Sequence, residues 1–268
     1  MPAVSLAHLQ KQIELLRWKY TQPEEFVVGL RNLLEKYSDY TYRAAASAPE
    51  AVRQIDAYHV PPVVTRQVEL ALYALVIENS SPALNLANLL WQEEKEEPRL
   101  LAIYLLGILP ASEFEQVIET IESWALSVND QAMLEALLEQ GSNNLRQYTI
   151  QRWLSKIQEW TSRDSIKFQK LGLLALLSLL KDRQFENLPQ VFNICTPLFQ
   201  GKIKGLSHEL SRVLEALAQR SPAELAYYVR QLIGSAASDD LRRLIRRCLP
   251  AFPDAVQERI RPILHRTT

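Results

Sequence analysis

Apolar side chains recur with helical spacing along almost the whole chain, and this pattern limits the fold more than any other feature. Ile13 and Leu16 share one helix face, and Phe26, Leu30 and Leu33 share the next. No stretch alternates apolar and polar residues as a strand flanked by hairpin turns does. Only 7 of the 268 residues are glycine, so tight hairpins and bulges are poorly supplied. The sequence therefore predicts an all-α protein.

Polar caps or prolines precede most of these apolar runs. The segment Thr21-Gln22-Pro23-Glu24 is a capping box with proline in the first turn. Further helix starts are predicted at Pro98, Ser112, Asp130, Ser165, Asn187, Ser207, Asp239 and Pro253. This gives about thirteen or fourteen helices with short connections, or about 35–40 residues for each helix pair. The alanine-rich run 43–51 is either a short helix or a loop.

That spacing predicts a HEAT-like α-α solenoid of about six to seven antiparallel helix pairs, in which each pair buries its apolar face against its neighbours. An irregular all-α bundle is the alternative. We expect residues 1–268 to form a single domain of this kind.

Charge is divided unevenly along the chain. Residues 1–140 carry ten Lys/Arg against twenty Asp/Glu, whereas residues 141–268 carry twenty against eleven. The formal net charge of −1 therefore hides an acidic half, 1–140, and a basic half, 141–268. Such asymmetry points to a polyanionic partner for the basic half, either a nucleic acid or an acidic protein.

Several classes of protein are disfavoured. Two cysteines far apart, Cys195 and Cys248, make no disulfide framework and suit a reducing compartment. The first residues lack a basic start followed by an apolar run, and the most apolar stretch, 171–180, is about half as long as a membrane span. No glycine-rich nucleotide loop and no His/Cys ligand spacing occurs. We therefore expect a cytoplasmic monomer with no membrane partner, no cofactor and no metal.

The densest basic cluster lies between residues 242 and 247. On a helix, Arg243 and Arg247 share one face, and Arg242 and Arg246 share the adjacent one. The functional interpretation is a phosphate-binding ridge, and the alternative is a solvated helix face. Since equivalent helices of a solenoid line one surface, we expect a nucleic-acid-binding set formed by Arg152, Lys156, Lys167, Lys170, Arg212, Arg242, Arg243, Arg246 and Arg247.

Aromatic residues are interleaved with some of these cations. Tyr148, Trp153 and Trp160 are predicted to share one helix with Arg152 and Lys156. This mixture suits stacking on nucleic-acid bases, whereas core packing at helical spacing is the alternative.

Three segments carry a resemblance to a known family: AYHVPP at 57–62, LANLLW at 86–91 and EEPRLLAIYLLG at 96–107. They resemble the DNA alkylation repair glycosylases, which are HEAT-like repeat proteins, and the resemblance covers about residues 50–250. It implies a concave basic surface that holds duplex DNA, and removal of positively charged alkylated purines.

The resemblance also assigns residues. It places the essential carboxylate of the family, which stabilises the cation-like sugar, on Asp130, and an essential arginine near Lys170. Two aromatic positions of the family fall on Leu126 and near Arg212. Asp130 is also the expected N-cap of the helix that follows it. The resemblance therefore implies DNA binding with weak or absent glycosylase activity.

Three functions remain open from the sequence. The first is a DNA-binding HEAT-like protein of the alkylation-repair type with weak or no glycosylase activity. The second is a protein-interaction solenoid whose basic surface takes an acidic segment of a partner. The third is an active glycosylase with a rearranged pocket.

Overall fold

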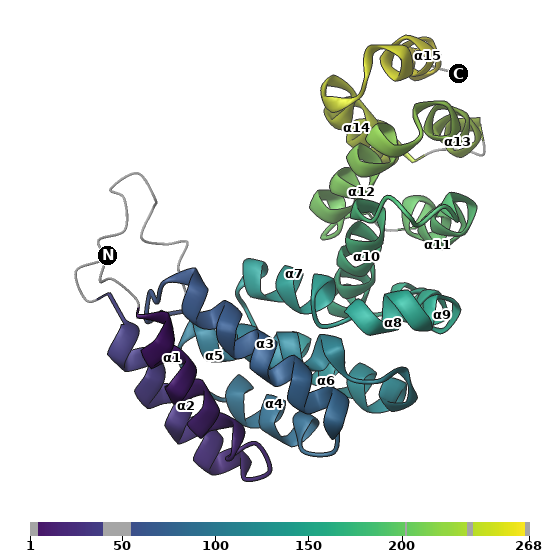
Figure 1. Ribbon diagram of the computed structural model, residues 1–268. Coiled ribbons are helices and arrows are strands. Elements are labelled where there is room, and N and C mark those ends of the chain that lie inside the picture. Colours follow the sequence, from purple (N-terminus) through teal and green to yellow (C-terminus); the bar gives the residue numbers. More distant parts are fainter. Residues whose placement is uncertain (1–4, 40–54, 202, 235–237, 266–268) are drawn as a thin grey trace. The chain divides into compact units, whose positions relative to one another are not determined.

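The structure is a computed structural model that describes residues 5–39, 55–201, 203–234 and 238–265 (Figure 1). These residues form a succession of α-helices, from α1 to α15, and no β-strand occurs among them. An isolated bridge joins Asp56 to Lys95. The prediction of an all-α chain of stacked helices is confirmed, while the number of helix pairs stays a prediction. The alanine-rich run 43–51 lies outside the described residues.

The chain divides into two compact units, which we call unit 1, Met1–Thr149, and unit 2, Ile150–Thr268. Unit 1 carries 11 Lys/Arg against 20 Asp/Glu, and unit 2 carries 19 against 11. The charge boundary predicted between residues 140 and 141 therefore falls close to the boundary between the units. The single domain predicted for residues 1–268 stays a prediction.

Unit 1 stacks its helices in two layers. Helices α1, α3 and α5 pack in succession in one layer, α2 packs on α4 in the other, and α4 and α5 form a closely packed hairpin. The bounds are α1 Leu6–Arg17, α2 Pro23–Tyr37, α3 Pro62–Glu78, α4 Ala83–Trp91, α5 Glu96–Ile108, η2 Ala111–Glu113, α6 Phe114–Ser127, α7 Gln131–Glu139 and α8 Asn143–Tyr148.

The helix starts follow the sequence signals with small shifts. Helix α2 begins at Pro23, as the proline predicts, with two glutamates in its first turn. Its N-cap is Gln22, which makes no side-chain cap hydrogen bond, so the predicted capping box is wrong. Helix α5 begins at Glu96 rather than at Pro98, so the end of the acidic run 93–97 is helical. Helix α6 begins at Phe114, because a 3₁₀ turn occupies the residues after Pro110.

A close approach of backbones fixes one glycine of unit 1. A Cβ atom on Gly107, within α5, would lie 2.0 Å from the carbonyl oxygen of Gln140 at the end of α7. Two backbone segments therefore meet where no side chain fits, and glycine is required by packing rather than by its own dihedral angles.

Unit 2 also has two layers. Helices α10, α12 and α14 pack in succession in one layer, which we call the α10–α12–α14 layer, and α9, α11, α13 and α15 pack in succession in the other. The bounds are α9 Ile150–Ser162, α10 Ile166–Lys181, α11 Leu188–Gln200, α12 Ser207–Arg220, α13 Pro222–Gly234, α14 Asp239–Cys248, η3 Leu249–Ala251 and α15 Asp254–His265 (Figure 1).

Among the described residues, no single helix is long and apolar enough to cross a membrane. The helices Glu96–Ile108 and Ala111–Ser127 reach the required length and composition only as a pair, and the pair is bent by 102°.

Candidate nucleic-acid interface

The α10–α12–α14 layer of unit 2 collects most of the predicted basic residues. Lys167 and Lys170 lie in the first turns of α10, Arg212 lies on α12, and the four predicted arginines between 242 and 247 lie on α14. The other two predicted residues, Arg152 and Lys156, lie on α9 in the opposite layer. Sequence alone does not fix which helices share a layer, so it does not separate the cations of α9 from those of α10, α12 and α14.

Helix α14 presents its arginines because its apolar residues all face inward. Leu241, Leu244, Ile245 and Cys248 are buried, with 0–3% of their surface exposed. The helix begins after Ser238, whose hydroxyl oxygen accepts a hydrogen bond of 3.2 Å from the backbone N–H of Leu241. The side chains opposite the buried stripe therefore carry the positive charge toward solvent.

Three of the arginines also bind groups of the protein itself. Arg247 Nη2 donates to the carbonyl oxygen of Ser207, at 3.2 Å, and to Ser211 Oγ, at 3.3 Å. Arg246 Nη2 donates to the carbonyl oxygen of Leu264 in α15, at 3.2 Å. Arg243 Nη1 lies 3.7 Å from Asp240 Oδ1, in an exposed ion pair. The first two contacts tie α14 to its neighbours, so these arginines have a structural role besides any role in binding.

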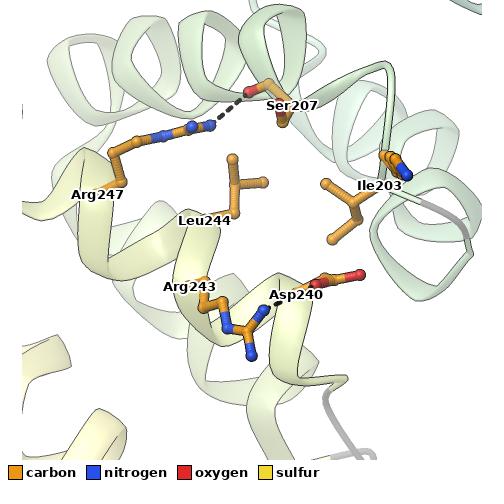
Figure 2. A pocket seen from close by; sticks show the side chains of 7 residues that line it. Ile203, Ser207, Asp240, Arg243, Leu244 and Arg247 are labelled. Carbon is orange, nitrogen blue, oxygen red and sulfur yellow. Dashed lines mark hydrogen bonds and ion pairs between the residues drawn. The ribbon is translucent and has the colours of Figure 1, made fainter.

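Three adjoining cavities follow the ends of α10, α12 and α14. The first, of about 320 Å³, lies between α14 and the first turn of α12 (Figure 2). The second, of about 1120 Å³, shares Lys204 and Asp240 with the first and extends to the start of α10 at Lys167. The third, of about 340 Å³, shares Ser207 and Arg247 with the first. The predicted residues Lys167, Arg243 and Arg247 therefore line a group of three adjoining cavities.

Lys204 lines two of these cavities and was missed by sequence reasoning. It lies between Ile203 and Gly205 in the connection from α11 to α12, outside any helix face. Gly205 has φ +93°, a left-handed conformation, and a Cβ there would lie 3.3 Å from Ile166 Cδ1. The glycine thus lets the connection turn closely against the start of α10. The sequence signal for this site is the dipeptide Lys204-Gly205, a cation next to a glycine.

A buried carboxylate lies between two helices of the layer. Glu209 on α12 has a side chain that is 7% exposed, and its Oε1 lies 3.5 Å from Lys170 Nζ on α10. Its Oε2 is buried and has no hydrogen-bond partner among the described residues. Lys170, where the family resemblance places an arginine, is therefore partly neutralised by a first-turn glutamate of α12.

Asp130, the predicted catalytic carboxylate, caps a helix of unit 1. It is the N-cap of α7, and its Oδ1 accepts a hydrogen bond of 2.8 Å from the backbone N–H of Met133. The expected capping role is therefore confirmed. The catalytic role stays a prediction.

The predicted aromatic helix is wrong in one respect. The helix is interrupted at Thr149. Tyr148 is the last residue of α8, and the two tryptophans lie on α9. Trp153 and Trp160 are both 0% exposed and form an edge-to-face pair with ring centroids 5.4 Å apart. They pack in the core of unit 2 and are inaccessible to bases, as the alternative interpretation held. Tyr148 is 70% exposed.

The described residues contain no group of three or more His, Cys, Asp and Glu side chains that could hold a metal ion. Both cysteines are buried. Burial raises the pKa of the Cys195 thiol to about 12 and also raises the pKa of Cys248. Neither thiol is therefore a ready nucleophile.

Helix pairs stacked in layers, with cations gathered on one layer, define a helical-repeat protein with a basic face. A family model described as DNA alkylation repair enzyme matches residues 62–248. The chain belongs to this family, as the sequence resemblance predicts. The searches of curated proteins and of solved structures found no match to this chain.

Proposed function

We propose that the protein binds duplex DNA through the α10–α12–α14 layer of unit 2 and takes part in the repair of alkylated DNA with weak or no glycosylase activity of its own. Membership of the DNA alkylation repair enzyme family supports a role related to DNA repair. The observation that carries the DNA-binding part is that Lys167, Lys204, Arg243 and Arg247 line three adjoining cavities.

Electrostatics favour unit 2 over unit 1 as the DNA-binding part. Unit 2 carries 19 Lys/Arg against 11 Asp/Glu, and unit 1 carries the reverse excess. DNA binding by exposed cations releases counterions from the phosphates, so affinity falls steeply as salt rises. Contacts of this kind position a protein on the duplex without reading its sequence.

Weak or absent glycosylase activity is supported by the aromatic residues. Trp153 and Trp160 are buried, and Leu126 and Arg212 occupy the positions where the family resemblance places tryptophans. A cationic lesion base is held best by the exposed face of an aromatic ring. Asp130, the inferred carboxylate, already accepts a hydrogen bond as a helix cap.

The test is fluorescence anisotropy with a short duplex, plain or containing 7-methylguanine, over a salt series. We expect the wild-type protein to bind both duplexes with a steep negative salt slope. The variant Lys167→Ala/Arg243→Ala should reduce the magnitude of that slope by about 2, about 1 for each lost phosphate contact.

The matched control is Arg230→Ala/Arg259→Ala, which removes two exposed charges from α13 and α15 in the opposite layer. Equal losses in the two variants would contradict the assignment of the binding face. No binding of the wild type even at low salt would reject the DNA proposal and favour the second function, capture of an acidic protein segment by the same surface.

The same duplexes test the third function. Release of 7-methylguanine by the wild type, and its loss in Asp130→Asn, would establish an active glycosylase. Because Asn is also a good N-cap, that variant changes the carboxylate while keeping helix α7 capped.

A further inference from the structure

The first cavity of unit 2 has a composition that its neighbours lack. Three cations surround it: Lys204 from the connection before α12, and Arg243 and Arg247 from α14. Ile203 and Leu244 also line it, and each is 3% exposed (Figure 2). Positive charge against an apolar wall is less screened than positive charge in open water.

The three cations are available to a ligand to different degrees. Among the described residues, none forms an ion pair with Lys204, which is exposed. Arg243 pairs with Asp240 at 3.7 Å, with side chains 74% and 63% exposed, and such pairs stabilise little. Arg247 is held in place by Ser207 and Ser211 through one of its terminal nitrogens, so its other N–H groups can still donate.

We propose that this cavity binds one phosphodiester group of the DNA backbone, with Lys204 and Arg243 as its principal ligands, Arg247 as a fixed third cation and Asp240 as a competing carboxylate. The proposal rests on the proposed function and names the place where the backbone is held. We call the cavity the phosphate seat.

The arrangement of donors favours phosphate over the carboxylate of an acidic peptide. Lys204 approaches from the loop, whereas Arg243 and Arg247 lie one helical turn apart on α14. A carboxylate offers two oxygens in one plane, which suit a single guanidinium fork. A phosphodiester carries its charge on a tetrahedral group, so cations on different sides of the cavity can contact it together.

The neighbouring cavity indicates the path of the DNA strand beyond the phosphate seat. It shares Lys204 and Asp240 with the phosphate seat and reaches Lys167 and Gln169 at the start of α10. The next phosphate along the strand would therefore lie toward Lys167, and Lys204 would stand between the two.

Single substitutions in the full-length protein test the phosphate seat against a short duplex in a salt series. We expect Lys204→Ala to weaken binding about fivefold and to reduce the salt slope by about 1. Asp240→Asn should strengthen binding severalfold, because it removes the competing carboxylate. The control Arg230→Ala removes an exposed charge on α13, outside the cavity, and should change binding less than twofold.

The proposal is overturned if Lys204→Ala behaves like Arg230→Ala, or if Asp240→Asn fails to gain affinity, while the wild type still binds DNA. In that case the broader DNA function stands and only the phosphate seat is wrong. Circular dichroism of each variant checks that the fold is kept.

Two further arms separate failure of the phosphate seat from failure of the DNA function. If the wild type binds no duplex, inorganic phosphate is titrated against chloride at constant ionic strength, and the backbone amides of Ser207 and Leu244 are followed by NMR. A saturable change that is lost in Lys204→Ala supports an anion site without a DNA function, and no change rejects both. A glutamate-rich peptide of equal charge that binds more tightly than the duplex, and gains more from Asp240→Asn, would overturn the assignment to phosphate.

Discussion

Replacing Lys170 by methionine is expected to destabilise unit 2 by leaving a carboxylate buried without a counter-charge. The amino group of Lys170 lies 3.5 Å from Oε1 of Glu209, whose side chain is 7% exposed. The other oxygen of this carboxylate is buried and has no hydrogen-bond partner among the described residues. Methionine keeps the length of the lysine stem, so the change removes mainly charge.

The size of the effect follows from distance and exposure. Two unit charges 3.5 Å apart attract by about 5 kcal/mol at an effective dielectric constant of about 20. The side chain of Lys170 is 42% exposed, so water screens much of this attraction. Losing one partner of a fully buried pair costs about 3–5 kcal/mol, so we expect Lys170→Met to lower the free energy of unfolding by about 2 kcal/mol.

A double-mutant cycle with Glu209→Gln isolates the charge interaction. In the Glu209→Gln background, Lys170→Met should cost less than about 1 kcal/mol, which gives a coupling energy of about 1–2 kcal/mol. Amide hydrogen exchange of α10 under mild urea measures the opening free energy within unit 2 itself. Equal losses in both backgrounds would refute the reasoning, because the lysine would then act only through packing of its stem.

Other contacts give further predictions. Asp130→Ala should destabilise α7 by about 1 kcal/mol in urea unfolding, whereas Asp130→Asn should stay within a few tenths, because asparagine also caps the backbone N–H of Met133. Gly107→Ala should cost about 3 kcal/mol, measured the same way, since its methyl group would lie 2.0 Å from the carbonyl oxygen of Gln140; a neutral result would show that α5 moves freely. Cys195, whose pKa burial raises to about 12, should resist a thiol reagent at pH 8 until unfolding. Its contribution to stability should be complete below the pKa of an unfolded thiol, about 8.5, and should fall as pH rises toward 12.

Much of the fold could be predicted because the periodic pattern is local. The stripe of Leu241, Leu244 and Ile245 fixes both the existence of α14 and the face on which its arginines lie. The cap at Asp130 and the proline at Pro23 mark helix starts by chemistry that acts within one turn. The change in net charge between residues 140 and 141 falls close to the boundary between the compact units.

The rest of the candidate site depends on contacts between helices, and the sequence does not encode these locally. Arg152 lies in the layer opposite the other predicted cations, because packing between helices decides to which layer α9 belongs. Lys204 carries no periodic signal because it lies in a connection. Glu209 has the sequence context of a solvated first-turn acid, and only the approach of α10 buries it.

The contacts of the arginines decide which residues can report on DNA binding. Arg246 and Arg247 donate to backbone carbonyl oxygens of Leu264 and Ser207, so substituting either one loosens α14 as well as removing charge. Loss of binding in those variants would therefore not distinguish a phosphate contact from a displaced helix. Lys167 and Lys204 are exposed and line the second cavity, and among the described residues no ion pair joins them to a carboxylate. DNA binding by this layer is therefore best tested at these two lysines. Substituting them removes positive charge near a bound phosphate while the packing of unit 2 is kept.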